Sequence, residues 1–268
     1  MNSDRLLLDK IKKNLRTRVI GREIITLEHT TSTMDIAKQM LSNSAKEGAV
    51  IFSERQTKGR GRSGKTWVCP KSKGLLLTII LKPAISPEKS YLLIGFSAVA
   101  AVKTIRDMFK LPIEIDWPND LVINKKKLGG ILIETQKETG KDTNYIVGIG
   151  INVNLNKQEL PKHVDKQVTS LAIEKETFID RTKLARALLQ NLDSWYLILK
   201  EERYEYIVEK WREFCANVGR KMIIRKNNQE YSGSLVEISN SGELMLLLDN
   251  GCRKTFRIEH TIVKYLNE

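Results

Sequence analysis

The sequence is poor in residues that bind metals or form disulfides. Its 268 residues include three cysteines and three histidines, and Cys69, Cys215 and Cys252 lie far apart without a CxxC pair. A structural zinc site needs Cys or His ligands clustered at short spacings, which this sequence does not supply. We therefore expect free thiols in a reducing cytosol, with neither a zinc site nor a disulfide framework.

Long apolar runs are also missing. The longest candidate, Leu75–Leu81, has the length of a strand, whereas a membrane-spanning helix needs about 20 apolar residues. The first residues mix polar and apolar types, and Asp4 interrupts any signal-peptide pattern. We expect a cytoplasmic protein with no membrane partner.

Negative charge is in the minority. The chain carries 45 Lys and Arg against 32 Asp and Glu, a formal net charge of +13, and the basic residues are spread along its length. This charge suits a nucleic acid, an acidic protein partner or a phosphorylated substrate. A helix-turn-helix module takes roughly 60 residues, and about 20 residues precede the first predicted strand. We expect no specific DNA binding, and a basic nucleic-acid-binding protein remains an alternative.

Hydrophobic patterning and turn residues predict two domains. Residues 1–217 mix strands and helices, which favours an α+β domain in which helices pack on a mixed sheet. Residues 218–268 hold short strands between turn signals, typical of a small all-β barrel. The predicted helices cover 4–15, 90–109, two segments within 179–215 and one that ends near 41 after N-cap candidates at 30–33. The predicted strands cover 23–28, 49–53, 74–81, 113–117, 121–124, 130–136, 145–154, 221–225, 230–238, 243–248 and 254–258, with a turn at 125–127 and mostly loop over 156–176.

The polar loop 54–73 contains Gly59-Arg60-Gly61-Arg62-Ser63-Gly64, a formal match to G-x-G-x-x-G. A dinucleotide fingerprint must open a helix and precede an acidic residue by about 20 positions, and this segment does neither. Its glycines let the backbone approach a ligand closely. The cations around them favour a carboxylate or phosphate, and Trp67 argues against a disordered loop. These cations are Lys58, Arg60, Arg62 and Lys65.

Three further motifs follow, each with a purely structural alternative. Trp117-Pro118-Asn119-Asp120 forms a rigid turn, or offers polar groups to a nucleotide and its magnesium ion. Lys127-Leu128-Gly129-Gly130 places a cation beside accessible backbone, or is a surface lysine at a strand start. Glycines within the strand around Gly148 and Gly150 mark a bulge or a close backbone approach.

In this order, the motifs resemble the catalytic domain of biotin–protein ligases. The resemblance rests on Ser32-Thr33, GRGRSGKTW at 59–67, WPNDL at 117–121, KKLGGILIE at 126–134 and GIGINVN at 148–154. It runs from about residue 24 to 154, and the C-terminal barrel fits more loosely. It implies the class II synthetase-like fold of that family, in its monofunctional type without an N-terminal DNA-binding domain and hence without repressor function. The implied reaction activates biotin with ATP to biotinyl-5′-AMP and transfers biotin to a lysine of a carboxylase carrier domain.

The same resemblance implies the roles of individual residues. Lys127 and Arg62 would be catalytic, because a biotin carboxylate attacking the α-phosphorus brings two anions together and cations offset their repulsion. Asn119 and Asn152 would bind the nucleotide, and Asp120 would bind Mg²⁺. Biotin and its adenylate would be bound by Ser32, Thr33, Met34, Gln56, Gly59, Arg60, Gly61, Arg62, Trp67, Lys127 and Gly130.

The sequence departs from the family pattern at two places. Asp116 stands where the family usually has a lysine, which reverses a charge on the nucleotide side. The stretch 168–171 lacks the tryptophan that covers the adenine in some members. The resemblance also implies ATP and biotin as substrates, Mg²⁺, a biotin carboxyl carrier domain as partner, and a homodimer. A lipoate or octanoate ligase of the same fold is the enzyme alternative.

Overall fold

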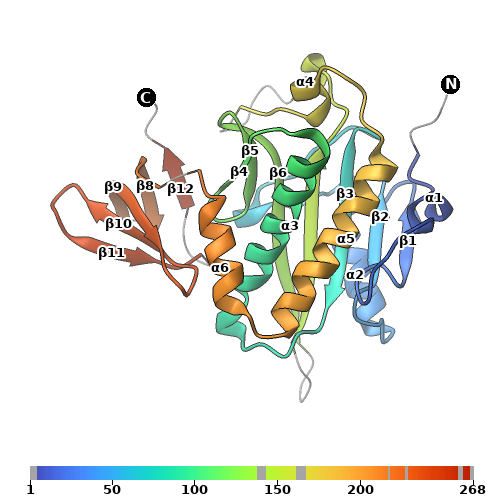
Figure 1. The fold of residues 1–268 in the computed structure, drawn as a ribbon, viewed down its shortest axis with the longest axis horizontal. Coiled ribbons are helices and arrows are strands. Elements are labelled where there is room, and N and C mark those ends of the chain that lie inside the picture. Colours follow the sequence, from blue (N-terminus) through green and yellow to red (C-terminus); the bar gives the residue numbers. More distant parts are fainter. Residues whose placement is uncertain are drawn as a thin grey trace.

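A computed structural model gives the fold (Figure 1) and describes residues 5–137, 143–160, 167–216, 218–226, 229–258 and the backbone of 262–265. Its larger sheet has seven strands in the order β1-β2-β3-β7-β6-β5-β4. Only β1 and β2 are parallel among these neighbours, since the crossover helix α2 lies between them in the sequence. The strands are β1 (Ile24–Leu27), β2 (Val50–Ser53), β3 (Gly74–Leu81), β4 (Ile113–Asp116), β5 (Asp120–Ile123), β6 (Lys126–Gln136) and β7 (Asn144–Asn152).

Helices cover both faces of this sheet, and the alternation of side chains along β3 separates them. Leu75, Leu77 and Ile79 point into the main core beneath α3 (Tyr91–Phe109), α5 (Arg181–Lys200) and α6 (Tyr204–Glu213). Ile80 points to the other face, where it joins a smaller apolar cluster under α2 (Thr33–Ser42). Figure 1 shows α3, α5 and α6 side by side in front of the strands. The face that carries α2 has fewer helices, and the loop 54–73 lies on it.

The C-terminal sheet is small and entirely antiparallel. Its order is β11-β10-β9-β8-β12, and it lies beside α6 (Figure 1). No described pairing joins the two edge strands, so the predicted barrel is seen here as a five-stranded sheet. The all-β character is confirmed, although the fifth strand was not predicted. The strands are β8 (Lys221–Lys226), β9 (Gln229–Ile238), β10 (Leu244–Leu248), β11 (Arg253–Phe256) and β12 (Ile262–Tyr265).

The turn between β9 and β10 joins the two sheets. The indole N–H of Trp117 donates to the carbonyl of Gly242 at 3.3 Å, and the Tyr91 hydroxyl donates to the carbonyl of Asn240 at 3.2 Å. Gly242 has φ +71°, and a Cβ there would lie 2.5 Å from the Tyr91 ring. The turn therefore depends on glycine for both its conformation and its fit. The domain boundary predicted at Asn217 lies outside the described residues.

The predicted elements are confirmed in their main lines and corrected in detail. The first helix, α1, covers only Leu8–Lys12, and Asp4 lies outside the described residues. The turn predicted at 125–127 is wrong: Asn124 and Lys125 have φ 50° and 66° and form the two-residue hairpin turn that such backbone angles favour. Lys127 is therefore a strand residue. The stretch 156–176 contains a 3-10 turn at Lys157–Glu159 and the short helix α4 (Leu171–Lys175).

Free thiols were predicted, and all three cysteines are free. Burial raises the pKa of the Cys69 thiol to about 12, so it remains protonated at neutral pH. Within the described ranges, no group of three or more acidic, Cys or His side chains could hold a metal ion. None of the helices described here combines the length and apolar character needed to cross a bilayer.

Candidate active site

The loop 54–73 is closed at its base by a buried ion pair. Arg181, whose side chain is fully buried, reaches Glu54 at 2.7 Å and donates to the carbonyl of Gly74 at 2.9 Å. The Ser72 N–H donates to the carbonyl of Glu54 at 3.0 Å. Removing one partner of such a buried pair leaves the other charge buried and uncompensated, which typically lowers the stability of the fold by about 3–5 kcal/mol. The loop therefore starts and ends at fixed points.

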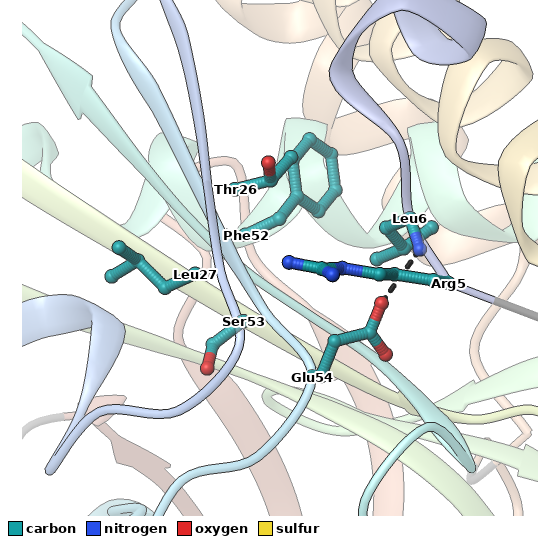
Figure 2. Close-up of a pocket in the computed structure, with 7 residues that line it drawn as sticks. All are labelled: Arg5, Leu6, Thr26, Leu27, Phe52, Ser53 and Glu54. Atoms are coloured by element: carbon teal, nitrogen blue, oxygen red, sulfur yellow. Dashed lines mark hydrogen bonds between the residues drawn. The ribbon is translucent and has the colours of Figure 1, made fainter.

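A small pocket lies beside this base. Figure 2 shows Arg5 and Leu6 of the N-terminal segment facing β1 and β2, with the N–H of Leu6 donating to Glu54 at 2.6 Å. The pocket has room for little more than one water molecule, whereas sites for small molecules measure about 300–1,000 Å³. It also lies apart from the cations discussed below. We do not assign it to a substrate.

The N-terminus of α2 gathers three of the predicted biotin-binding residues. Ser32 caps the helix, with its hydroxyl accepting from the N–H of Met34 at 3.3 Å. Gln56 accepts from the N–H and hydroxyl of Thr33 at 2.7 and 3.0 Å. The Thr33 hydroxyl also lies 2.7 Å from that of Thr78 on β3. Ser32 and Thr33 are thus buried, and Gln56 is half-buried beside them, at the carboxyl ends of β1 and β2.

Three glycines leave a strip without side chains across β6 and β7. A Cβ on Gly150 would lie 2.7 Å from the Trp67 ring, and one on Gly148 would lie 3.0 Å from the Met34 sulfur. Gly130 is paired with Gly150 in the sheet. The close backbone approach predicted at these positions is confirmed, with Trp67 as the group that comes close. Its indole N–H is buried and has no acceptor among the described residues.

Lys127 lies at the end of this strip and pairs with Asp120. Their side chains are 2.8 Å apart and are 28% and 14% exposed. The register of β5 against β6 shifts between Leu121 and Val122, and such a bulge redirects side chains. Lys127 consequently lies beside Gly130, whose Cβ would be 3.7 Å from the lysine nitrogen. The ammonium group is also 5.7 Å from the centre of the Trp67 ring.

Arg62, at the tip of the loop, reaches both sheets. One guanidinium N–H donates to the side chain of Asn119 at 3.1 Å, and another donates to the carbonyl of Ile258 at 2.7 Å. Asn119 is held in turn by Ile131, which accepts from its amide at 2.8 Å. The WPND motif, which contains a cis Trp117–Pro118 bond, therefore supports the loop. The two predicted catalytic cations thus contact neighbouring residues of the same motif.

Arg60 has different surroundings from Arg62. Its guanidinium group binds both carboxylate oxygens of Glu134, at 2.9 and 3.3 Å, and Asp35 at 2.7 Å. Burial alone would raise the pKa values of both carboxyls, but hydrogen bonds and charge from Arg60 hold each pKa below its usual range. Hydrogen bonding to Glu134 raises the pKa of Arg60. The three groups are therefore charged at neutral pH.

The remaining predicted residues have mainly structural contacts. Gly59 and Gly61 belong to a small hairpin in which the Trp67 N–H donates to the carbonyl of Gly59 at 2.9 Å. Met34 is 4% exposed and belongs to the apolar cluster under α2. Asn152 donates from its amide to the carbonyl of Thr169 at 3.1 Å. These residues line or support the site in the absence of ligand.

The two departures from the family pattern can now be located. Asp116 is 6% exposed and lies opposite Asp120 across β4 and β5. Burial and the charges of Asp116 and Glu114 raise the pKa of the Cys215 thiol. The stretch without tryptophan runs beside the start of β6, where the Thr169 N–H donates to the carbonyl of Lys127 at 2.9 Å. Both departures thus border the Lys127–Asp120 pair.

Comparison with known proteins shows the family of this chain. The sequence model of the biotin/lipoate A/B protein ligase family matches residues 26–152. The bifunctional ligase/repressor BirA of Bacillus subtilis is 31% identical over 247 residues, which span 92% of this chain and 76% of that protein. The chain belongs to this family. The biotin–[acetyl-CoA-carboxylase] ligase of Mycobacterium tuberculosis is 25% identical over 91% of this chain and 92% of its own length.

A solved structure extends the family likeness to the whole fold. Biotin protein ligase from Aquifex aeolicus, in complex with biotin and ATP, has a TM-score of 0.79 and 25% identity. The match covers 91% of this chain and 100% of that chain. The predicted fold class is confirmed, including a small β unit after the mixed sheet.

Sequence reasoning did not single out three residues that the site brings together. Thr78 lies in a strand whose other residues are all apolar apart from Gly74, and Glu134 is the only carboxylate in β6. A lone polar group in an apolar strand is a usable signal, since burying it requires a partner. Asp35, in the first turn of α2, gives no comparable signal. Its role depends on where the loop places Arg60.

Proposed function

We propose that this protein is an ATP-dependent biotin–protein ligase. The proposal rests on one arrangement in a chain of this family. A glycine strip is bordered by the Lys127–Asp120 pair, Arg62 and the Thr33–Gln56 group. The polar group at α2 suits a ureido ring, and the glycine strip beside Trp67 suits an aliphatic chain. Lys127, at the far end, suits the carboxylate.

The first reaction step joins two anions. The biotin carboxylate attacks the α-phosphorus of ATP, a P–O bond forms to the carboxylate oxygen, and pyrophosphate leaves with the electrons of the broken bond. Lys127 and Arg62 would offset the repulsion and stabilise negative charge on the phosphoryl oxygens. The contacts of Arg62 with Asn119 and Ile258 would place its positive charge before the substrates arrive.

The second step transfers biotin to a protein lysine. The lysine amine attacks the acyl carbon of biotinyl-AMP, and AMP leaves with the electrons of the acyl–oxygen bond. This mixed anhydride hydrolyses in water, so the loop 54–73 would protect it by lying over the strip. No step needs a covalent enzyme intermediate. A biotin carboxyl carrier domain is the proposed acceptor, and an acidic carrier would suit the net charge of +13.

A magnesium ion brought by ATP fits the residues present. Mg²⁺ bound with substrate phosphates typically uses one or two carboxylates from the protein, and Asp120 supplies a carboxylate beside Lys127. We propose that Asp120 holds this ion and that Asn119 and Asn152 lie on the nucleotide side. When bound, the ion would neutralise charge on the departing pyrophosphate.

Other parts of the proposal rest on the family resemblance. We propose a homodimer, a cytoplasmic location, and a division into a catalytic domain at 1–217 and a C-terminal domain at 218–268. The ligand contacts proposed for Ser32, Met34, Gly59, Gly61, Trp67 and Gly130 belong with them.

The test is biotin-dependent exchange of labelled pyrophosphate into ATP, with lipoate and octanoate run in parallel. We expect exchange with biotin alone, since the Thr33–Gln56 group offers hydrogen bonds that an aliphatic chain cannot use. Exchange with lipoate or octanoate alone would keep the adenylation chemistry and refute the substrate. No exchange with any acid, in folded protein with magnesium present, would refute the proposed activity.

A further inference from the structure

The side chain of Arg60 joins three segments that each carry proposed site residues. Glu134 lies on β6, the strand of Lys127 and Gly130. Asp35 lies in the first turn of α2, next to the Ser32–Thr33 pair. Arg60 itself is in the loop that carries Arg62. We call the Asp35–Arg60–Glu134 set the loop clamp.

The loop clamp engages all three nitrogens of the guanidinium group. The Nε and Nη2 atoms bind the two oxygens of Glu134 at 2.9 and 3.3 Å, and Nη1 binds Asp35 at 2.7 Å. Bidentate pairs of this kind combine strength with a fixed orientation. The three side chains are 21–35% exposed, so water screens them less than an ordinary surface pair. Lys38 also contacts Glu134, at 2.7 Å.

Charge within the clamp is already balanced. Asp35 and Glu134 contribute two negative charges, and Arg60 and Lys38 contribute two positive charges. An incoming carboxylate or phosphate would therefore find the charge of Arg60 already compensated by two carboxylates. Arg62, by comparison, donates to the side-chain oxygen of Asn119 and to the backbone carbonyl of Ile258. The two arginines of the GRGR segment therefore bind different groups.

The backbone on either side of Arg60 also distinguishes Arg60 from Arg62. Arg60 pairs with Thr66 across a short hairpin, and the Gly61 N–H donates to the carbonyl of Lys65 at 2.6 Å. Arg62 lies within the bend of this hairpin, where Ser63 has φ 55°. Fixing Arg60 therefore fixes the stem from which Arg62 and Trp67 extend.

We propose that Arg60 is a positioning residue, held by Asp35 and Glu134, that locks the stem of the loop to α2 and β6. The side chain of Arg60 then acts through the loop and not on the reacting groups themselves. Asp35 and Glu134 become positioning residues for the same reaction. The kinetic part of this inference rests on the proposed function.

The kinetic test is a double-mutant cycle on pyrophosphate exchange with Arg60→Ala, Glu134→Gln and the double variant. We expect each single change to raise KM for biotin about fivefold to tenfold with kcat within about twofold, the size expected for one or two partly exposed charged pairs. Because both changes break the same clamp, the double variant should be no worse than Arg60→Ala. If the Arg60 side chain instead touched substrate, Arg60→Ala would raise KM for biotin by the same factor in the wild type and in the Glu134→Gln variant. That additive result would refute the clamp.

A second readout needs no substrate. Lys65 is exposed beyond the hairpin stem, so the rate of tryptic cleavage after Lys65 reports opening of the loop. We expect Asp35→Asn, Glu134→Gln and Arg60→Ala each to speed this cleavage severalfold, with a fall of only a few degrees in melting temperature. Unchanged cleavage in all three would overturn the clamp even if the protein proved inactive with biotin. Failure of the clamp and failure of the proposed activity are thus separable.

The chain offers a matched control on the other limb of the same loop. Lys71 and Glu28 form an ion pair at 2.5 Å, with both side chains 52% exposed. Glu28→Gln removes an ion pair that also holds the loop, but one that is more exposed and joins the loop neither to α2 nor to β6. We expect unchanged KM for biotin and unchanged cleavage after Lys65. An effect as large as that of Glu134→Gln would show that any lost charge loosens the loop, and would refute a specific clamp.

Discussion

Replacing Lys127 with alanine tests the centre of the proposed site. The change removes the ammonium group that lies 2.8 Å from Asp120 and leaves that carboxylate, 14% exposed, without its lysine partner. The adenylation site would then lose the positive charge of Lys127 and keep the negative charge of Asp120. Both effects act where the biotin carboxylate and the α-phosphate meet, and neither acts on the distant Thr33–Gln56 group.

The size of the loss follows from these two effects. Removing one preorganised donor to a developing negative charge typically costs about 10²–10³ in kcat, or about 2.7–4 kcal/mol. Two like charges about 4 Å apart at an effective dielectric constant of about 20 add up to about 4 kcal/mol of repulsion. We therefore expect Lys127→Ala to lower kcat for pyrophosphate exchange by at least about 10³, with a much smaller change in KM for biotin.

Two further variants make the assay decisive. Lys126→Ala removes the neighbouring lysine, whose side chain points to the opposite face of β6, and should leave exchange nearly normal. Lys127→Ala combined with Asp120→Asn should recover up to about tenfold if Asp120 mainly repels phosphate in the single variant. A further loss, together with a higher magnesium requirement, would indicate that its role in holding Mg²⁺ dominates. Near-normal exchange in folded Lys127→Ala would refute the assignment of Lys127.

Three other predictions follow from the loop and the strip beneath it. Arg62→Gly should loosen the loop tip and release adenylate, so that biotin appears on unrelated proteins such as serum albumin; labelling confined to the carrier would contradict this. Gly150→Ala places a methyl group 2.7 Å from a Trp67 ring atom, and the displaced ring should lower the melting temperature, at a cost of about 1–3 kcal/mol, and weaken biotin binding in calorimetry. An unchanged affinity would refute the position of Trp67. Because the fold lowers the pKa values of Asp35 and Glu134 from 3.8 and 4.5, their stabilising effect should be complete above those values and vanish as the pH falls through the lower folded values. The difference in melting temperature between the wild type and the Asp35→Asn, Glu134→Gln double variant should therefore disappear in acid, and a difference that persists there would contradict the ion-pair explanation.

Much of the fold followed from local patterns. The apolar run at 74–81 predicted a central strand, and β3 is buried over its whole length. Turn residues in the last fifty positions predicted a separate all-β unit, which is confirmed by the second sheet. The turn at 125–127 was misplaced because three consecutive lysines look like a polar turn, whereas the positive φ angles of Asn124 and Lys125 define it. Backbone angles of this kind are not visible in composition.

The sequence by itself determined the family and most of the candidate site, because the motifs keep their residue types and their order. Only the tertiary structure decided which groups each cation contacts. Arg60 and Arg62 are two positions apart in one glycine-rich segment and look equivalent in the sequence. One binds two carboxylates, 25 and 74 positions away, and the other contacts Asn119 and Ile258, 57 and 196 positions away. The role of a charged side chain depends on the groups that fold against it, and contacts between such distant residues exist only once the chain has folded.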